Sequence, residues 1–299
     1  MENKKPSIGV ICRPKLNPTE KHLFPLLKKE FNLISFPVQK DIDYEKLIEQ
    51  AKDVKIILNT AGDVPNVEDA LEMVKTFEGM NKHVIDSSHS FYYKEDKWLF
   101  YQLCVKHNFP TPKTYYIPRD IELSKDKLRE ILDEGPVVFK GIFSDAGRAV
   151  KRALNYEEAL KVLKSLRKKI GSMPLIAQRY IPHGTVSYRV TLFEENIIQS
   201  IIKHGKTWKE GGLFWKNEKY KKFTPDKKLA DLCKKVARVF KIEWCGIDLM
   251  RDDKGKWYII EVNSCPSMDF VLSDVKRANK EFIKYIHRLN RKLENQHDN

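Results

Sequence analysis

The stretch from Trp244 to Asn263 limits the possible fold more than any other part of the sequence. Two apolar runs flank the turn-forming residues Asp252-Asp253-Lys254-Gly255, and this pattern predicts a β-hairpin. If Lys254-Gly255 forms a two-residue loop, Asp253 faces Lys256 across the hairpin. The two predicted strands are Cys245 to Met250 and Trp257 to Val262.

The same register brings oxygen-bearing side chains onto one face of the hairpin. Asp248 then faces Glu261, and Asn263, two residues further on, points to the same face as Glu261. Asn263 lies opposite Gly246, which has no side chain and leaves space. Magnesium and manganese prefer carboxylate and carbonyl oxygens, and magnesium usually lies between a few carboxylates and substrate phosphates. The hairpin therefore predicts a divalent metal site formed by Asp248, Glu261 and Asn263.

An alternative interpretation places these carboxylates on the solvent side of an edge strand. It accounts for Asp248 or Glu261 alone. It accounts poorly for two carboxylates that face each other inside otherwise apolar strands, because they repel there. A bound cation relieves this repulsion, so the metal site is the favoured interpretation.

Composition narrows the class of protein. The chain has 299 residues, of which 41% are hydrophobic and 32% charged, which is typical of a globular protein with two or three small domains. No apolar run is long enough for a transmembrane helix, and the N-terminus lacks a signal-peptide core. The five cysteines are scattered without a CxxC pair, which indicates a reducing, cytoplasmic location and no disulfide or zinc framework.

The formal net charge of +14 indicates an anionic partner. Nucleic acid, a membrane surface, and small polyanions such as nucleotides or acidic metabolites all fit this sign. The basic residues are spread along the chain and form no single arm. Charge alone therefore does not choose between these partners.

Alternating strands and helices organise the first part of the chain. They predict parallel βαβ units in a small open α/β domain over residues 1–94. Ligands of such sheets bind at the carboxyl ends of strands, so Asn59 to Asp63 is a candidate substrate loop. Two further α+β regions are predicted over residues 95–177 and 178–299. The strands predicted for the first domain are Ser7 to Cys12, Leu33 to Val38, Val54 to Asn59, and Val84-Ile85.

Two lysines are candidates for phosphate contacts. Lys140 ends the predicted strand Pro136 to Lys140 and precedes a loop of small residues that includes Gly141 and Gly147. The backbone N–H groups of such a loop can surround phosphates while the lysine adds a positive charge. Lys97 lies in an apolar stretch and could add a second charge. Taken singly, each lysine also fits a strand end or a helix face that reaches into water.

Six short motifs follow one another along the chain. Together they resemble the ATP-grasp superfamily, and within it most closely the RimK-type carboxylate–amine ligases. The resemblance covers nearly the whole chain. It implies an ATP-grasp fold of the α/β (α+β) class, in which a small N-terminal open α/β domain precedes two α+β subdomains that grip the nucleotide. The motifs that carry the resemblance are Asp96-Lys97, VVFK ending at Lys140, Gln178-Arg179-Tyr180-Ile181, Tyr188-Arg189-Val190, CGIDLM with Asp248, and IIEVN with Glu261.

The resemblance implies ATP as the nucleotide and assigns residues to it. Lys97 and Lys140 would hold the phosphates, and the loop from Ser144 to Gly147 would close over them. A hinge would read adenine with its backbone. The hinge residues would be Gln178, Arg179, Tyr180 and Ile181.

The remaining motifs would supply the reaction centre. Arg189 would contact the transferred phosphate or the acyl phosphate. The resemblance also implies two Mg2+ or Mn2+ ions. Their ligands would be Asp248, Glu261 and Asn263, the same set that the hairpin predicts independently.

Several positions depart from the family pattern, mainly where substrates are chosen. Arg179 stands where an acidic residue is common, and Ser187 stands where an aspartate often precedes the arginine position. The segment from Lys203 to Lys209 replaces one that carries arginine and asparagine. Ser267 stands where a glycine usually follows proline.

The predicted reaction is a two-step ligation. A substrate carboxylate attacks the γ-phosphate of ATP and gives an acyl phosphate, and an amine such as an amino acid then displaces phosphate to form an amide. Positioning and charge neutralisation dominate phosphoryl transfer. The anionic acid could be a protein C-terminus, a cofactor tail or a free metabolite. A membrane partner is not expected.

The nearest alternative is a small-molecule kinase on the same scaffold. The hinge from Gln178 to Gly184, followed by Arg189, also resembles that of the inositol polyphosphate kinases of the superfamily. His183 would then contact phosphate, although it also fits a simple turn residue. Glu261 favours the ligase, because these kinases tend to have aspartate there.

A nucleic-acid or ribosome-associated binder is a third, less favoured interpretation. The segment from Lys203 to Phe223 alternates lysines with aromatic residues, and bases stack on aromatic rings in basic grooves. Such a segment is more often a substrate lid or a solvated face.

Overall fold

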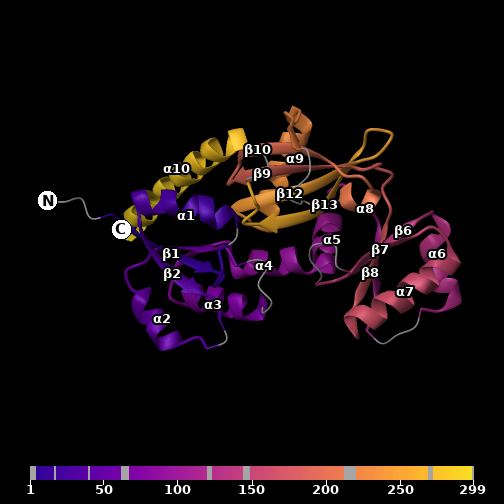
Figure 1. The fold of residues 1–299 in the computed structure, drawn as a ribbon, viewed down its shortest axis with the longest axis horizontal. Coiled ribbons are helices and arrows are strands. Elements are labelled where there is room, and N and C mark those ends of the chain that lie inside the picture. The colour runs from indigo at the N-terminus through magenta and orange to yellow at the C-terminus, as the bar shows by residue number, and fades with distance from the viewer. Residues whose placement is uncertain are drawn as a thin grey trace.

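The computed structural model contains three β-sheets that follow one another along the chain (Figure 1). The structure describes residues 5–16, 18–39, 41–61, 67–119, 123–143, 149–211, 220–268 and 272–297. The ATP-grasp class predicted from the sequence agrees with this arrangement, in which a small α/β unit precedes two α+β units.

The first sheet is parallel and has the strand order β2-β1-β3-β4. Three predicted strands reappear with shifts of one or two residues, and the prediction of parallel βαβ units is confirmed. The loop predicted to bind substrate begins at Asn59, whose Oδ1 accepts the Ala61 N–H at 3.1 Å, and its last two residues, Gly62 and Asp63, lie outside the described ranges. The strands are β1 (Ser7–Cys12), β2 (Asn32–Pro37), β3 (Ile56–Asn59) and β4 (His83–Ile85).

Four helices belong to this first unit. Asp43 caps helix α2, since its side chain accepts the Lys46 N–H at 3.0 Å. Helix α4 was not predicted from the sequence, because no apolar stripe marks it and its cap, Ser87, lies in a polar cluster. The helices are α1 (Pro18–Glu30), α2 (Tyr44–Gln50), α3 (Val67–Gly79) and α4 (Ser88–Glu95).

The second sheet is antiparallel and has the order β5-β8-β6-β7. Helices α6 (Lys125–Asp133) and α7 (Tyr156–Ile170) cover it and close a separate apolar core. Strand β8 runs to Arg179, so the boundary predicted after residue 177 falls inside this strand. Strand β7 was not predicted. The strands are β5 (Thr114–Ile117), β6 (Val137–Gly141), β7 (Val150–Ala153) and β8 (Leu175–Arg179).

The third sheet is antiparallel and has the order β11-β10-β9-β12-β13. Its two faces differ sharply. Helix α9 (Lys227–Phe240) packs its apolar stripe against one face together with α5 (Lys97–Lys106), whereas the other face carries polar side chains. The strands are β9 (Val186–Phe193), β10 (Asn196–His204), β11 (Tyr220–Lys222), β12 (Trp244–Arg251) and β13 (Trp257–Ser264), and the short helix α8 (Trp208–Gly211) follows β10.

Helix α9 begins later than the sequence indicates. The dipeptide Thr224-Pro225 predicts the cap and first turn, but the helix starts at Lys227 and Asp226 caps it, accepting the Leu229 N–H at 2.8 Å. Aspartate is the stronger cap of the two candidates, because its charge also favours the positive end of the helix dipole.

Helix α10 (Leu272–His297) joins the third sheet to the first unit (Figure 1). It lies along α1, and one apolar core contains Leu23 and Phe31 of the first unit, Phe193 and Trp244 of the third sheet, and Phe282 of α10. The segment predicted as the last domain thus completes the core of the first one. Within the described ranges, no helix is both long and apolar enough to cross a membrane.

Candidate active site

Strands β12 and β13 place the predicted metal ligands as the sequence indicates. Asp248 pairs with Glu261, and Gly246 pairs with Asn263, so the predicted register at the site is confirmed. The space at Gly246 is filled by Pro266, because a Cβ atom at Gly246 would lie 2.6 Å from the Pro266 Cβ atom. Only glycine allows the loop after β13 to approach the sheet this closely.

The tip of the hairpin differs from the prediction. Asp252, and not Asp253, lies across from Lys256, with its N–H donating to the Lys256 carbonyl at 3.0 Å. The loop has one more residue than predicted, and Gly255 adopts a φ of +82°. A register shift between Asp248 and Leu249 restores the pairing at the site. The two-residue loop was therefore wrong, although the pairing inferred from it was correct.

The neighbouring strand adds an arginine to the same row of the sheet. Arg189 on β9 lies directly opposite Asp248. Its Nε and Nη2 atoms donate to the two carboxylate oxygens of Asp248 at 2.6 and 2.7 Å. Arg189, Asp248 and Glu261 thus lie side by side on three neighbouring strands. We call these three residues the charged row.

Burial controls the electrostatics of this ion pair. It raises the pKa of Asp248, and the guanidinium of Arg189 opposes this shift. Burial also disfavours the charge on Arg189, but the Asp248 carboxylate outweighs it and raises the pKa of Arg189. Each charge therefore depends on the other for compensation in a medium of low dielectric constant.

The donor set fits a magnesium-type cation. Asn263 Nδ2 donates to Asp248 Oδ2 at 3.1 Å, which leaves the amide oxygen of Asn263 as a ligand atom beside the two carboxylates. Among the described residues, no group of three or more histidine, cysteine or acidic residues is suited to a metal ion. Two carboxylates and one amide oxygen match magnesium, which takes its remaining ligands from water and substrate phosphates.

Lys140 and Lys97 lie beside this row from a different direction. Lys140 Nζ donates to Gln178 Oε1 at 2.7 Å, and Lys97 Nζ reaches the Ile142 carbonyl at 3.5 Å. Burial lowers the pKa of Lys140 to about 8; the Glu261 carboxylate opposes this shift, and the Lys97 ammonium adds to it. The second sheet, helix α5 and the third sheet therefore bring two cations and a carboxylate together.

The four predicted hinge residues behave differently from one another. Gln178 points inward to Lys140, whereas Arg179 points away and donates to the Ile131 and Gly135 carbonyls and to Glu134. Ile181 is buried. The Arg179 and Tyr180 N–H groups donate to the Lys113 and Pro136 carbonyls and so belong to the sheet.

Tyr180 belongs to an aromatic cluster at the edge of the site. The guanidinium of Arg152 on β7 lies 4.7 Å from the Tyr180 ring and 4.9 Å from the Trp208 ring. Trp208 lies in α8, within the segment considered as a substrate lid or nucleic-acid platform, and it meets Tyr180 edge-on at 6.0 Å. Phe223, at the other end of this segment, packs on Tyr188. Both rings are half-buried and contact other side chains of the protein, so neither ring is fully open for base stacking.

Two predicted phosphate residues, Ser144 and Gly147, lie outside the described residues. His183 was considered as a phosphate ligand in the kinase alternative. Its Nδ1 lies 2.9 Å from the Val186 carbonyl, and burial lowers its pKa. A turn histidine accounts for this geometry.

No sequence pattern predicts the pairing between Arg189 and Asp248 or the Lys140–Gln178 hydrogen bond. Both depend on which strands become neighbours, and residues far apart in the chain meet only through the observed strand order. Lys94 was also missed. Its Nζ donates to Ser264 Oγ at 3.0 Å and joins α4 to the end of β13.

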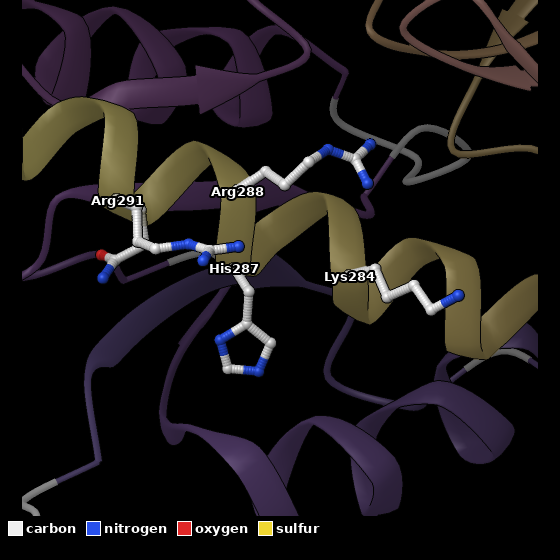
Figure 2. A pocket seen from close by; sticks show the side chains of 5 residues that line it. Lys284, His287, Arg288 and Arg291 are labelled. Carbon is white, nitrogen blue, oxygen red and sulfur yellow. The ribbon is translucent and has the colours of Figure 1, made fainter.

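A separate basic pocket of about 560 Å3 lies on helix α10 (Figure 2). Its lining residues Lys284, His287 and Arg288 face nearby carboxylates. These are Glu281 at 2.7 Å, Glu30 at 3.5 Å and Glu194 at 3.5 Å, respectively. Three of the basic side chains that line the pocket are thus paired with carboxylates.

Three sheets, a sheet face with paired carboxylates, one lysine from the neighbouring sheet and one from helix α5 define an ATP-grasp protein. A solved D-alanine–D-alanine ligase from Bacillus anthracis, complexed with ATP, has the same fold with a TM-score of 0.70. It is 16% identical, and the match covers 96% of this chain and 98% of that one. The predicted fold class is confirmed.

A family model described as the RimK-like ATP-grasp domain matches residues 94–286, and the chain belongs to this family of carboxylate–amine ligases. The match spans the charged row, both lysines and the hinge. The resemblance to RimK-type ligases inferred from the sequence is therefore confirmed.

Two curated relatives carry glutamate ligase names. A probable alpha-L-glutamate ligase from Haemophilus influenzae is 20% identical over 200 residues, which cover 67% of this chain and 64% of that protein. The chain thus spans less than two thirds of the length of that relative. A coenzyme gamma-F420-2:alpha-L-glutamate ligase from Methanocaldococcus jannaschii is 24% identical over 222 residues, which cover 72% of this chain and 74% of that protein.

Proposed function

We propose that this chain is an ATP-dependent ligase that joins a carboxylate to an amine through an acyl phosphate. The observation that carries this proposal is the convergence of the charged row with Lys97 and Lys140. Three elements deliver cations and carboxylates to one place, an arrangement suited to a polyphosphate with divalent cations.

The two lysines act on the nucleotide. Lys97 and Lys140 hold the phosphates of ATP, and Gln178 fixes the ammonium of Lys140 through its 2.7 Å hydrogen bond. Because the Arg179 and Tyr180 N–H groups are used within the sheet, the adenine edge is read by hinge carbonyls and by the backbone of Ile181. A bound triphosphate restores the full charge of Lys140, whose pKa burial lowers to about 8.

The charged row acts on the transferred phosphate. Two N–H groups of Arg189 donate to the two carboxylate oxygens of Asp248, which orients the guanidinium along the charged row. It stabilises the charge that develops when the substrate carboxylate attacks the γ-phosphate. Asp248, Glu261 and the amide oxygen of Asn263 would hold two Mg2+ or Mn2+ ions. These ions, when bound, neutralise phosphate charge.

The substrates are an anionic carboxylate and an amine such as an amino acid. The names of the relatives make L-glutamate the first amine to test. A protein C-terminus, a cofactor tail and a free metabolite are the acids to compare.

An ADP-release screen of acid–amine pairs with Mg2+, with product masses recorded, tests the proposal. We expect ADP and phosphate to form only when both substrates are present, and the product mass to equal acid plus amine minus water. Transfer of phosphate to an alcohol without any amine would instead establish a kinase. ATP turnover that requires RNA would support the nucleic-acid binder.

A further inference from the structure

A second row of side chains lies next to the charged row on the same face of the third sheet. Gln199 pairs with Thr191, Thr191 pairs with Gly246, and Gly246 pairs with Asn263. Thr191 is two residues from Arg189 on β9, so both side chains point to one face. We call Gln199 and Thr191 the neutral pair, because neither side chain is charged.

The neutral pair has two buried polar atoms that lack partners. Thr191 Oγ1 and Gln199 Oε1 are inaccessible to solvent, and neither has a hydrogen-bond partner among the described residues. Gln199 Nε2 donates to the Met268 carbonyl at 3.1 Å, which orients the amide and makes Oε1 an acceptor. A buried acceptor without a donor is costly, so a group that supplies N–H donors is favoured there.

The neutral pair lies where the site ends and the apolar core begins. Phe193, the next residue of β9 on this face, belongs to the core around α10, whereas Arg189 on the other side belongs to the charged row. Pro266 and Met268 cover this part of the face, as the close approach of Pro266 to Gly246 and the Gln199 hydrogen bond indicate.

We propose that Thr191 and Gln199 form the subsite that binds the amino group of the second substrate. This inference rests on the proposed ligase function and deepens it. The amine donates its N–H groups to Thr191 Oγ1 and Gln199 Oε1. Among the described residues, neither atom has a hydrogen bond that the amine would have to displace. Pro266 has to shift to admit the amine, while the Met268 carbonyl keeps the hydrogen bond that orients Gln199.

The spacing suits nucleophilic attack. Two residues along a strand span about 7 Å, which accommodates a phosphate at Arg189, the acyl carbon attached to it, and a nitrogen about 3 Å beyond. The nitrogen lone pair forms the new bond to the acyl carbon. The carbon–oxygen bond to phosphate breaks, and a proton from the amine leaves with the phosphate.

The absence of charge on Thr191 and Gln199 favours attack by the amine. A carboxylate in the same place would stabilise the ammonium form, which has no lone pair for attack. An amide oxygen and a hydroxyl bind an uncharged amine without that bias. The subsite is thus suited to an amine that has already lost its extra proton to solvent.

Binding of an amino acid and of its des-amino analogue tests the proposal. For L-glutamate the analogue is glutarate, and the two are titrated into the full chain with Mg2+ and a non-hydrolysable ATP analogue; another amino acid chosen by the screen is paired in the same way. We expect the wild type to bind the amino acid about tenfold more tightly than the analogue, and Thr191→Val to remove most of this preference. Thr191→Ser, which keeps the hydroxyl, retains it.

Ser200→Ala is the matched control. Ser200 Oγ is equally buried and unpartnered, but Ser200 pairs with Val190 and points to the opposite face, toward α9. This variant should keep the preference for the amino acid. Loss of the preference in Ser200→Ala as well, or an unchanged preference in a folded Thr191→Val protein, would overturn the subsite.

Trapping with hydroxylamine separates this inference from the proposed function. Hydroxylamine intercepts an acyl phosphate, so the wild type should form an acyl hydroxamate from ATP and the acid when no amino acid is present. Hydroxamate formation combined with an unchanged preference in Thr191→Val would overturn the amine subsite alone. Absence of hydroxamate with every acid tested would overturn the ligase and the subsite together.

Discussion

Two aspartates at strand β12 differ in their partners: Asp248 is part of the strand, and Asp86 accepts hydrogen bonds from its start. In the middle of the strand, Asp248 pairs with the guanidinium of Arg189. At the start of the strand, Asp86 accepts the Glu243 N–H at 2.7 Å and the Trp244 N–H at 3.3 Å through one oxygen, and its other oxygen is buried without a partner among the described residues.

The neighbours of the two aspartates therefore affect their pKa values differently. Burial and the nearby Glu243 carboxylate raise the pKa of Asp86 to about 8, and the two backbone N–H groups oppose this shift. At Asp248 the guanidinium opposes the effect of burial directly. A buried carboxylate thus marks a candidate site only together with the cation that keeps it charged, whereas Asp86 serves the junction between the first unit and the third sheet.

The largest effect should follow from Glu261→Ala. We expect turnover with a true acid–amine pair to fall by at least about a thousandfold, because the charged row loses the carboxylate that faces Asp248 and the phosphates. ADP release measures the rate, and thermal unfolding serves as the control for folding. Retained turnover in a folded variant would remove Glu261 from the mechanism.

Removal of one partner of the ion pair should lower stability in addition to abolishing activity. Asp248→Leu leaves Arg189 buried and uncompensated, so we expect the free energy of unfolding to fall by about 3 kcal/mol. The double variant Arg189→Met/Asp248→Leu should recover most of this loss and remain inactive. Urea unfolding measures both variants. Equal losses in the single and double variants would show that the ion pair does not carry the effect.

The free energy of unfolding should depend on pH because of Asp86. The pKa of Asp86 in the folded chain is about 8, raised from 3.8, so between these values the folded chain holds a proton that the unfolded chain releases. The free energy of unfolding should therefore fall as pH rises through this window, by up to about 1.4 kcal/mol per unit. Asp86→Asn keeps the acceptor oxygen and should flatten this dependence in urea unfolding series at several pH values. An identical slope in the variant would assign the dependence to other groups.

The smallest effect is expected for His83→Gln in the same region. His83 Nε2 lies 2.7 Å from Glu243 Oε1, but both side chains are about one third exposed, at 30% and 31%. Ion pairs of this kind contribute less than about 1 kcal/mol. Tyr285, which is buried and donates to the other oxygen of Glu243, should hold the junction when His83 is replaced. A loss of several kcal/mol in thermal or urea unfolding would contradict this ranking.

Much of the site could be predicted from the sequence because it depends on local patterns. The alternation of apolar and charged residues fixed which side chains of the hairpin share a face, and that held even though the loop was wrong. The register shift next to Asp248 compensated for the longer loop, and no sequence pattern announces such a shift.

The remainder depends on tertiary neighbours. Arg189 meets Asp248 only because β9 lies between β10 and β12. The backbone of Arg179 was expected to belong to the adenine hinge, and its side chain anchors the end of α6 through the Ile131 and Gly135 carbonyls, which no sequence pattern indicates. Strand β7, with the sequence VKRA, has too little apolar pattern to be recognised alone, and the sheet forms it by pairing with β6.

The core shared by helix α10 and the first unit has a consequence for biogenesis. Apolar side chains near the beginning of the chain, such as Phe31, are covered by Phe282 and its neighbours from the far end. During synthesis, the apolar side of the first sheet stays uncovered until the residues of α10 leave the ribosome. We therefore expect chaperones to bind this exposed apolar surface of the nascent chain. A chain truncated before α10 keeps the surface exposed and should be degraded by proteases.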